Sequence, residues 1–127
     1  MKFPIRALAL ALAGMVVTAG LLAACDSSSS PSATTTKVEV TANEFQFDPS
    51  ELTLPANQAA EIELTNGGAV EHDITIDAIE FNLLAPIGET VTGNIGPLDA
   101  GSYEIYCSIP GHKESGMIGT LAVEAVE

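Results

Sequence analysis

The sequence predicts an all-β protein, a two-sheet β-sandwich of Greek-key type with about seven or eight short strands. From Lys37 onward, apolar residues recur at every second position, which is the period of a strand rather than of a helix. Gly, Pro and Asn interrupt this alternation at short intervals, and no window holds a convincing helix of ten residues. The chain of 127 residues is therefore expected to hold one β domain, preceded by two segments of different composition.

Residues 1–24 are expected to form a lipoprotein signal peptide. Lys2 and Arg6 precede an apolar run that ends at Leu22, and the segment contains no acidic residue. The segment ends as Leu22-Ala23-Ala24 directly before Cys25. This sequence resembles the bacterial lipobox, where the Cys becomes the lipidated first residue. An uncleaved membrane anchor is the alternative, and both interpretations place the rest of the chain outside the cytoplasm. We therefore expect an exported protein, lipid-anchored to the membrane and facing the periplasm or the extracellular space.

The lipidated Cys and a flexible tether rich in Ser and Thr are expected over residues 25–36, and the folded domain over residues 37–127. From Cys25 onward the chain keeps all 17 acidic residues but only two cations, Lys37 and Lys113. So few cations argue against binding to nucleic acid. The acidic surface is suited to steering basic partners, and it equally fits a role in solubility or a salty habitat.

The strands follow in chain order, the first three centred on residues 38–42, 61–65 and 70–77. In the third, His72 shares the inward side with Val70, Ile74 and Ile76. The stretch from residue 78 to 88 is ambiguous and fits an edge strand, a loop or one helical turn. Two later strands have as inward residues Tyr103, Ile105 and Cys107 in one and Met117, Leu121 and Val123 in the other.

Four side chains with metal-binding chemistry emerge from this alternation. His72, Cys107 and Met117 are predicted to point inward, and His112 lies in the turn-rich link between Cys107 and Met117. Each one alone is more often an ordinary core residue than a ligand. Together, however, they include both His of the chain, its one Cys besides Cys25, and the one Met that lies after the signal peptide. A free thiol outside the cytoplasm also needs protection from oxidation, and metal binding provides it.

The donor set selects the metal. Two imidazoles and a thiolate with a weak, distant thioether are typical of a mononuclear electron-transfer copper site. Zinc would prefer a fourth strong ligand, and calcium or magnesium would require oxygen ligands. With only two Cys in the chain, a disulfide scaffold and a four-thiolate zinc or iron–sulfur site are excluded. We expect one copper ion that alternates between Cu(I) and Cu(II).

Residues 98–112 and 116–121 carry a resemblance to the cupredoxins, the small type 1 blue copper proteins of the plastocyanin and azurin superfamily. The resemblance implies that His72, Cys107, His112 and Met117 are the copper ligands, at one end of the sandwich. The spacing of four residues between Cys107 and His112, and again between His112 and Met117, is most similar to auracyanin and rusticyanin. Tyr103 resembles the tyrosine corner of Greek-key sandwiches, whose hydroxyl bonds to nearby main chain.

Two further features follow from the resemblance. Asp73 stands where plastocyanin and azurin commonly have Asn, at a position that braces the Cys-bearing loop, and an ionised carboxylate there would favour Cu(II). An apolar ring around His112 would be the docking patch for redox partners. The expected members of this ring are Ile109 and Pro110, together with Leu83, Leu84 or Ile87.

The sequence therefore predicts a monomeric, membrane-tethered blue copper protein that shuttles single electrons between redox partners such as cytochromes. We expect it not to be an enzyme, since copper oxidases and nitrite reductases need additional His ligands and this chain has two His. A copper-delivery or copper-storage lipoprotein is one alternative, although no Met-rich or His-rich segment supports it. An adhesive or structural sandwich, in which the His, Cys and Met pattern is coincidental, is the other.

Overall fold

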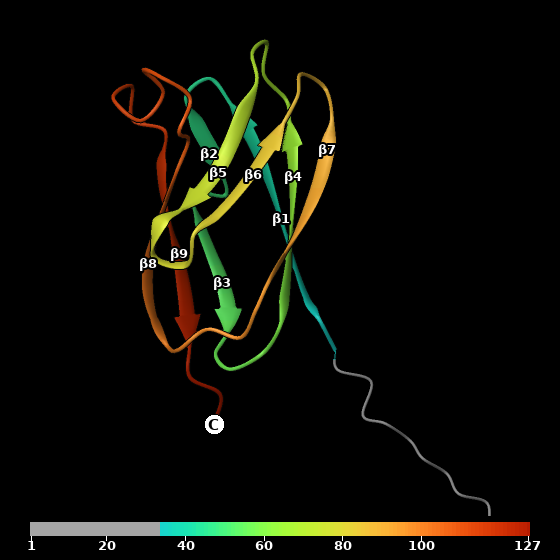
Figure 1. The fold of residues 1–127 in the computed structure, drawn as a ribbon, viewed down its shortest axis with the longest axis vertical. Helices are drawn as coiled ribbons and strands as arrows, with labels where there is room; N and C mark the ends of the chain where they lie inside the picture. The colour runs from blue at the N-terminus through green and yellow to red at the C-terminus, as the bar shows by residue number, and fades with distance from the viewer. Residues whose placement is uncertain (1–33) are drawn as a thin grey trace, which may run out of the picture. The chain divides into compact units, whose positions relative to one another are not determined.

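The structure, a computed structural model, describes residues 34–127 and confirms an all-β sandwich (Figure 1). It contains nine strands, slightly more than expected. They are β1 (Thr36–Asn43), β2 (Gln46–Asp48), β3 (Glu51–Pro55), β4 (Ala60–Asn66), β5 (His72–Ile76), β6 (Phe81–Ala85), β7 (Thr90–Ile95), β8 (Gly101–Tyr106) and β9 (Ile118–Glu124). The predicted signal peptide, Cys25 and the tether up to residue 33 lie outside the described residues. Within residues 34–127, no helix is long and apolar enough to cross a membrane.

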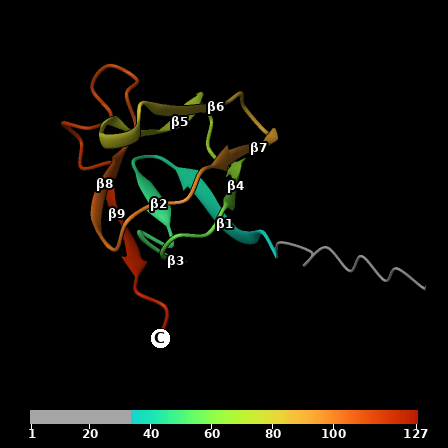
Figure 2. The ribbon, with the colours of Figure 1, turned by 60° about the horizontal axis from the view of Figure 1, so that its bottom comes forward.

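The strands form two mixed sheets. One has the order β2-β1-β4-β7 and the other the order β3-β9-β8-β5-β6. The β1–β4 and β3–β9 pairs are parallel, and the remaining pairs are antiparallel. Parallel neighbours that are not consecutive in sequence require crossovers between the sheets, as a Greek-key sandwich does. Figures 1 and 2 show edge strands β6 and β7 side by side, where the two sheets meet.

The ambiguous stretch over residues 78–88 combines all three predicted alternatives: a helical turn, an edge strand and, from Pro86, a loop. A 3₁₀ helix (Asp77–Ile79) turns the chain, and Glu80 closes this turn in the left-handed conformation with φ of 52°. The chain then returns as edge strand β6, antiparallel to β5. In β6 the exposed Leu84 directly follows the partly buried Leu83, so apolar residues stand on both faces and hide the alternation of the strand.

The core lies between the two sheets and follows the predicted alternation. Its largest fully buried aliphatic side chains are Leu52, Ile62, Leu64, Ile74, Ile76, Ile105 and Leu121. The tyrosine corner is confirmed, because the Tyr103 hydroxyl donates to the main-chain oxygen of Asp99 at 2.9 Å. This bond fixes the connection that enters β8.

Strand β5 departs from simple alternation. His72, Ile74 and Ile76 are buried as expected, but Asp73 and Thr75 on the opposite face are buried as well. The prediction that Val70 points inward is wrong: the residue precedes the strand and is 40% exposed. The inward–outward alternation holds only for the paired residues of the strand, and β5 begins at His72.

Four connections meet at one end of the sandwich, uppermost in Figure 1. They are the β1–β2 turn, the β4–β5 loop, the β6–β7 loop and the β8–β9 loop. Strand β1 starts at Thr36 beside Ala60, the first residue of β4, and therefore at the opposite end. The candidate site lies among the four connections.

Candidate metal centre

Three of the predicted ligands come together among these connections. His72 opens β5, Cys107 directly follows β8, and His112 lies in the β8–β9 loop. One donor atom from each lies within 4.8 Å of the others, and Cys107 Sγ is 3.3 Å from His112 Nδ1. His72 and Cys107 are 0% exposed and His112 is 8% exposed. The structure thus builds a buried His-Cys-His cluster from two elements far apart in the sequence.

Met117, the fourth predicted ligand, closes the same loop. Its side chain is 0% exposed. Its amide donates to the His112 carbonyl at 3.0 Å, and its carbonyl accepts from the Cys107 amide at 3.1 Å. The main chain of Met117 is therefore hydrogen-bonded to the main chains of Cys107 and His112, the two other predicted ligands of the loop.

The position of the thiol depends on how β8 leaves the sheet. Strands β5 and β8 share a single registered pair, Thr75 with Tyr106. Beyond it, the Asp73 amide donates to Cys107 Sγ at 3.4 Å, and the Ser108 amide donates to a carboxylate oxygen of Asp73 at 2.7 Å. Side-chain acceptors thus replace the carbonyls of a regular ladder, so that β8 separates from β5 and the sulfur faces His72.

Asp73 is the main brace of this loop. One carboxylate oxygen accepts from the Ser108 amide and the Thr75 hydroxyl, and the other accepts from the Ser108 hydroxyl and the Asn82 amide group. A buried carboxylate is tolerated only when its lone pairs are satisfied, and here donors reach both oxygens. Asp73 therefore connects β5, β6 and the Cys-bearing loop.

The electrostatics of the cluster favour neutral side chains. Burial raises the pKa of the Cys107 thiol. Burial, and secondarily the neighbouring His112, lowers the pKa of His72. A neutral imidazole presents a free lone pair, which is the form that binds a metal, whereas the thiol must release its proton on binding.

The cluster fits a metal on chemical grounds. Both ring nitrogens of His72 are buried and have no hydrogen-bond partner. Leaving a buried polar group unpaired costs about 1–3 kcal/mol, so such a group requires an explanation. Two imidazoles and one thiolate, with the buried Met117 thioether at the end of the same loop, match the donors of a type 1 copper site. They do not match a calcium or magnesium site, which would need oxygen ligands.

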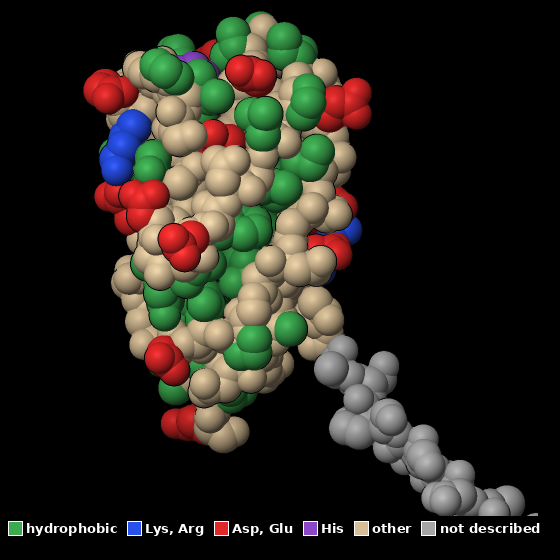
Figure 3. Space-filling view, in the orientation of Figure 1, with side chains coloured by type: hydrophobic (Ala, Val, Ile, Leu, Met, Phe, Trp, Pro, Cys, Tyr) green, Lys and Arg blue, Asp and Glu red, His purple; other side chains and the backbone are tan. Residues whose placement is uncertain are grey.

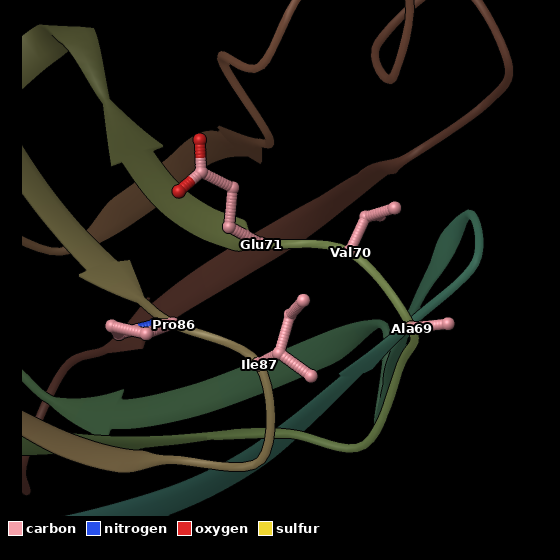
Figure 4. A pocket seen from close by; sticks show the side chains of 5 residues that line it. All are labelled: Ala69, Val70, Glu71, Pro86 and Ile87. Atoms are coloured by element: carbon pink, nitrogen blue, oxygen red, sulfur yellow. The ribbon is translucent and has the colours of Figure 1, made fainter.

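The rim of the cluster is largely apolar. Pro110, Leu84 and Ile87 are exposed, whereas Ile109 and Leu83 are partly buried and pack against the core. An open hollow of about 550 Å³ lies beside the cluster, lined by Ala69, Val70, Glu71, Pro86 and Ile87. Figure 4 shows Ile87 projecting toward the segment that carries Val70. In Figure 3 a histidine is just visible at this end, among hydrophobic side chains.

Two neighbours of the cluster were not predicted, Glu44 and Phe45 in the β1–β2 turn. The Phe45 ring meets the His112 ring edge-on with centroids 5.0 Å apart, and a Glu44 oxygen lies 3.6 Å from His72 Nε2. The available signal in the sequence was a Phe two residues before Phe47, in the same alternation; in the structure this Phe is 41% exposed. Because the turn is remote in sequence from all four ligands, only the folded chain shows the contact.

A Greek-key sandwich with a buried His-Cys-His cluster at its loop end defines a class of small metal-binding β proteins. Residues 14–123 match the model of the Cupredoxin-like domain. The chain therefore belongs to the cupredoxin-like family, which confirms the resemblance seen in the sequence.

Known proteins agree with this assignment. The copper-resistant cuproprotein CopI of Rubrivivax gelatinosus is 27% identical over 104 residues, which are 66% of this chain and 63% of that relative. The chain thus spans less than two thirds of CopI. Auracyanin A, a "blue" copper protein from Chloroflexus aurantiacus, is 26% identical with a TM-score of 0.58, over 69% of this chain and 98% of that one. The reduced auracyanin of Roseiflexus castenholzii gives a TM-score of 0.64 at 19% identity, over 71% of this chain and 98% of that one.

Proposed function

We propose that this protein is a mononuclear blue copper protein that transfers single electrons, with His72, Cys107, His112 and Met117 holding one copper ion. The observation that carries the proposal is the buried His-Cys-His cluster, in which neither ring nitrogen of His72 makes a hydrogen bond. The auracyanin likeness supports it, since auracyanin A is a blue copper protein with the same fold. It also supports the expectation that this cupredoxin is not an enzyme.

When bound, copper supplies a centre that alternates between Cu(I) and Cu(II). The chain's own contribution is rigidity. Asp73 accepts hydrogen bonds from the amide and hydroxyl of Ser108 and so holds the loop, and the Met117 main chain closes the same loop onto Cys107 and His112. A site that is held in one arrangement needs little rearrangement when an electron enters or leaves, which keeps transfer fast.

Electron exchange is expected at His112. It is the one proposed ligand with exposed surface, 8%, whereas the others are completely buried. Pro110 and Ile109 flank it on the ligand loop, and Leu84 and Ile87 extend the apolar rim. We propose that a redox partner, such as a cytochrome, docks on this rim, where removal of water brings its cofactor close to the His112 ring.

The lipid anchor at Cys25 is part of the same proposal. The described domain begins at the end of the sandwich opposite His112, because β1 starts beside the first residue of β4. An anchored domain would therefore present its apolar rim away from its point of attachment. This arrangement suits a carrier that meets partners in the periplasm or the extracellular space.

Copper delivery or storage is the second candidate, and the similarity to CopI favours it specifically. A delivery protein would use the same donors but release the ion readily. The bracing around Asp73 and Met117 argues for retention instead, since every ligand of the loop is tied to its neighbours.

The test is to add Cu(II) to the metal-free protein. We expect an intense thiolate-to-copper absorption band that disappears on reduction and is absent from Cys107→Ala. The matched control is Cys25→Ala, which removes the other Cys of the chain and should leave the band unchanged. A colourless wild type would refute the blue copper site. Rapid loss of copper to a mild chelator, without electron exchange with cytochromes, would favour delivery.

A further inference from the structure

His72 has a polar neighbour in the β1–β2 turn that neither the copper motif nor the family comparison predicts. A Glu44 carboxylate oxygen, Oε1, lies 3.6 Å from His72 Nε2. The imidazole is fully buried, and this carboxylate oxygen lies beside Nε2, where it can accept its proton. At 3.6 Å the contact is slightly longer than a hydrogen bond.

Glu44 is held in this position by the loop that precedes β5. The same Oε1 accepts a hydrogen bond from the Ala69 amide. A side chain that is 38% exposed thus has a fixed oxygen directed at a buried ring.

Gly68 makes the approach possible. A Cβ at this position would lie 2.7 Å from His72 Nε2 and within 3.0 Å of the Glu44 carboxylate. Any side chain would therefore push apart the two groups that the loop brings together. Gly68, the Ala69 amide and the Glu44 carboxylate thus lie together at the Nε2 side of the His72 ring.

We propose that Glu44 is a positioning residue for the copper site, the acceptor for the Nε2 proton of His72. The inference rests on the proposed function. In a metal-bound imidazole, the hydrogen bond made by one nitrogen sets which nitrogen binds the metal. With Nε2 committed to Glu44, Nδ1 is left for copper. A carboxylate partner also makes the ring a stronger donor, which stabilises Cu(II) relative to Cu(I) and lowers the reduction potential.

The competing explanation is that Glu44 merely caps the Ala69 amide and stabilises a loop. Three variants separate the two roles. Glu44→Ala removes both contacts, whereas Glu44→Gln keeps an acceptor oxygen and removes the charge. Glu89→Gln is the matched control, because it removes an exposed charge from the β6–β7 loop at the same end of the molecule.

We expect Glu44→Ala to bind Cu(II) about tenfold more weakly than wild type, with Glu44→Gln recovering most of this loss. The reduction potential should rise in both Glu44 variants and stay at the wild-type value in Glu89→Gln. Nitrogen NMR of the diamagnetic Zn(II)-loaded protein should show the His72 proton on Nε2, protected from water in wild type and exchanging faster in Glu44→Ala.

Wild-type potential and wild-type proton exchange in a folded Glu44→Ala would overturn the inference and leave loop capping as the role of Glu44. Because the NMR measurement uses zinc, it tests Glu44 even if the wild type is colourless with copper. A colourless wild type refutes the proposed function, whereas a blue wild type with an indifferent Glu44→Ala refutes only the role of Glu44.

Discussion

Asp73 contributes both to the fold and to the candidate metal site. It is 3% exposed, and its carboxylate collects donors from Thr75, Asn82 and Ser108. Its own amide donates to Cys107 Sγ. The side chain therefore braces the Cys-bearing loop, while its backbone contacts the sulfur directly.

The Asp73→Asn variant separates these contributions. We expect its reduction potential to be higher than that of wild type, because nearby negative charge stabilises Cu(II) over Cu(I) and the amide carries none. The Asn side chain retains an oxygen for the Ser108 amide, so the blue band should persist. Protein-film voltammetry measures the change, and a potential that does not rise would contradict this role of the charge.

Asp73→Ala is the companion variant. It leaves the part-buried Ser108 amide without its acceptor, at a cost of up to about 1–3 kcal/mol for a group left unpaired, whereas Asn82 keeps its bond to the Thr75 hydroxyl. Its unfolding free energy should therefore fall below that of Asp73→Asn.

At the scale of elements, the parallel β3–β9 pair depends on a close approach at Gly119. A Cβ at this position would lie within 3.0 Å of the Ser50 main-chain oxygen and 3.0 Å from the Ile105 side chain. The Ser50 oxygen accepts a hydrogen bond from the Thr120 amide at 2.9 Å, so it cannot move away without loss. In the sheet that carries the ligand loop, the close approach at residue 119 therefore depends on a glycine.

Gly119→Ala should destabilise the metal-free protein by about 1–3 kcal/mol, because the added methyl group overpacks a site bounded by backbone. For a domain of this size, this loss lowers the melting temperature by roughly 4–8 °C per kcal/mol. Gly101→Ala is the control, since its nearest neighbour would be 3.9 Å away. Equal melting temperatures for the two variants in calorimetry would show that the β3–β9 pair tolerates the methyl group.

At the scale of the whole molecule, charge is the dominant surface property. The full chain carries 17 acidic and four basic residues. Among residues 34–127 the two cations are both engaged, Lys37 with Glu63 at 2.7 Å and Lys113 with Glu104 at 2.6 Å. The described surface therefore offers no unpaired cation to a partner, and a basic redox protein is the complementary one.

Electron exchange with a basic cytochrome should consequently slow as salt is added. The reason is that screening over a Debye length of about 10 Å at 0.1 M removes the long-range attraction. Stopped-flow rates across an ionic-strength series measure the effect. An acidic cytochrome is the control and should show the opposite slope. Identical slopes for both partners would mean that the acidic surface serves solubility instead of steering.

The order and alternation of the residues by themselves determined the fold class, the inward faces of the strands and the choice of candidate ligands. Strand periodicity and donor chemistry are local properties that survive without a fold. The pattern was insufficient at the edges, where Val70 lies outside its strand and residues 78–88 combine a turn with a strand.

Tertiary structure alone decided which groups surround the ligands. It buried both faces of β5, and it brought the Asp73 carboxylate to Ser108, Phe45 to His112, and Glu44 to His72. The physical reason is that these contacts join segments remote in sequence, whose approach depends on sheet order and on how closely the loops pack. Local preferences hold no record of either, so the candidate donors could be predicted from the pattern and the brace at Asp73 from the family resemblance, whereas the approach of Glu44 and Phe45 could not.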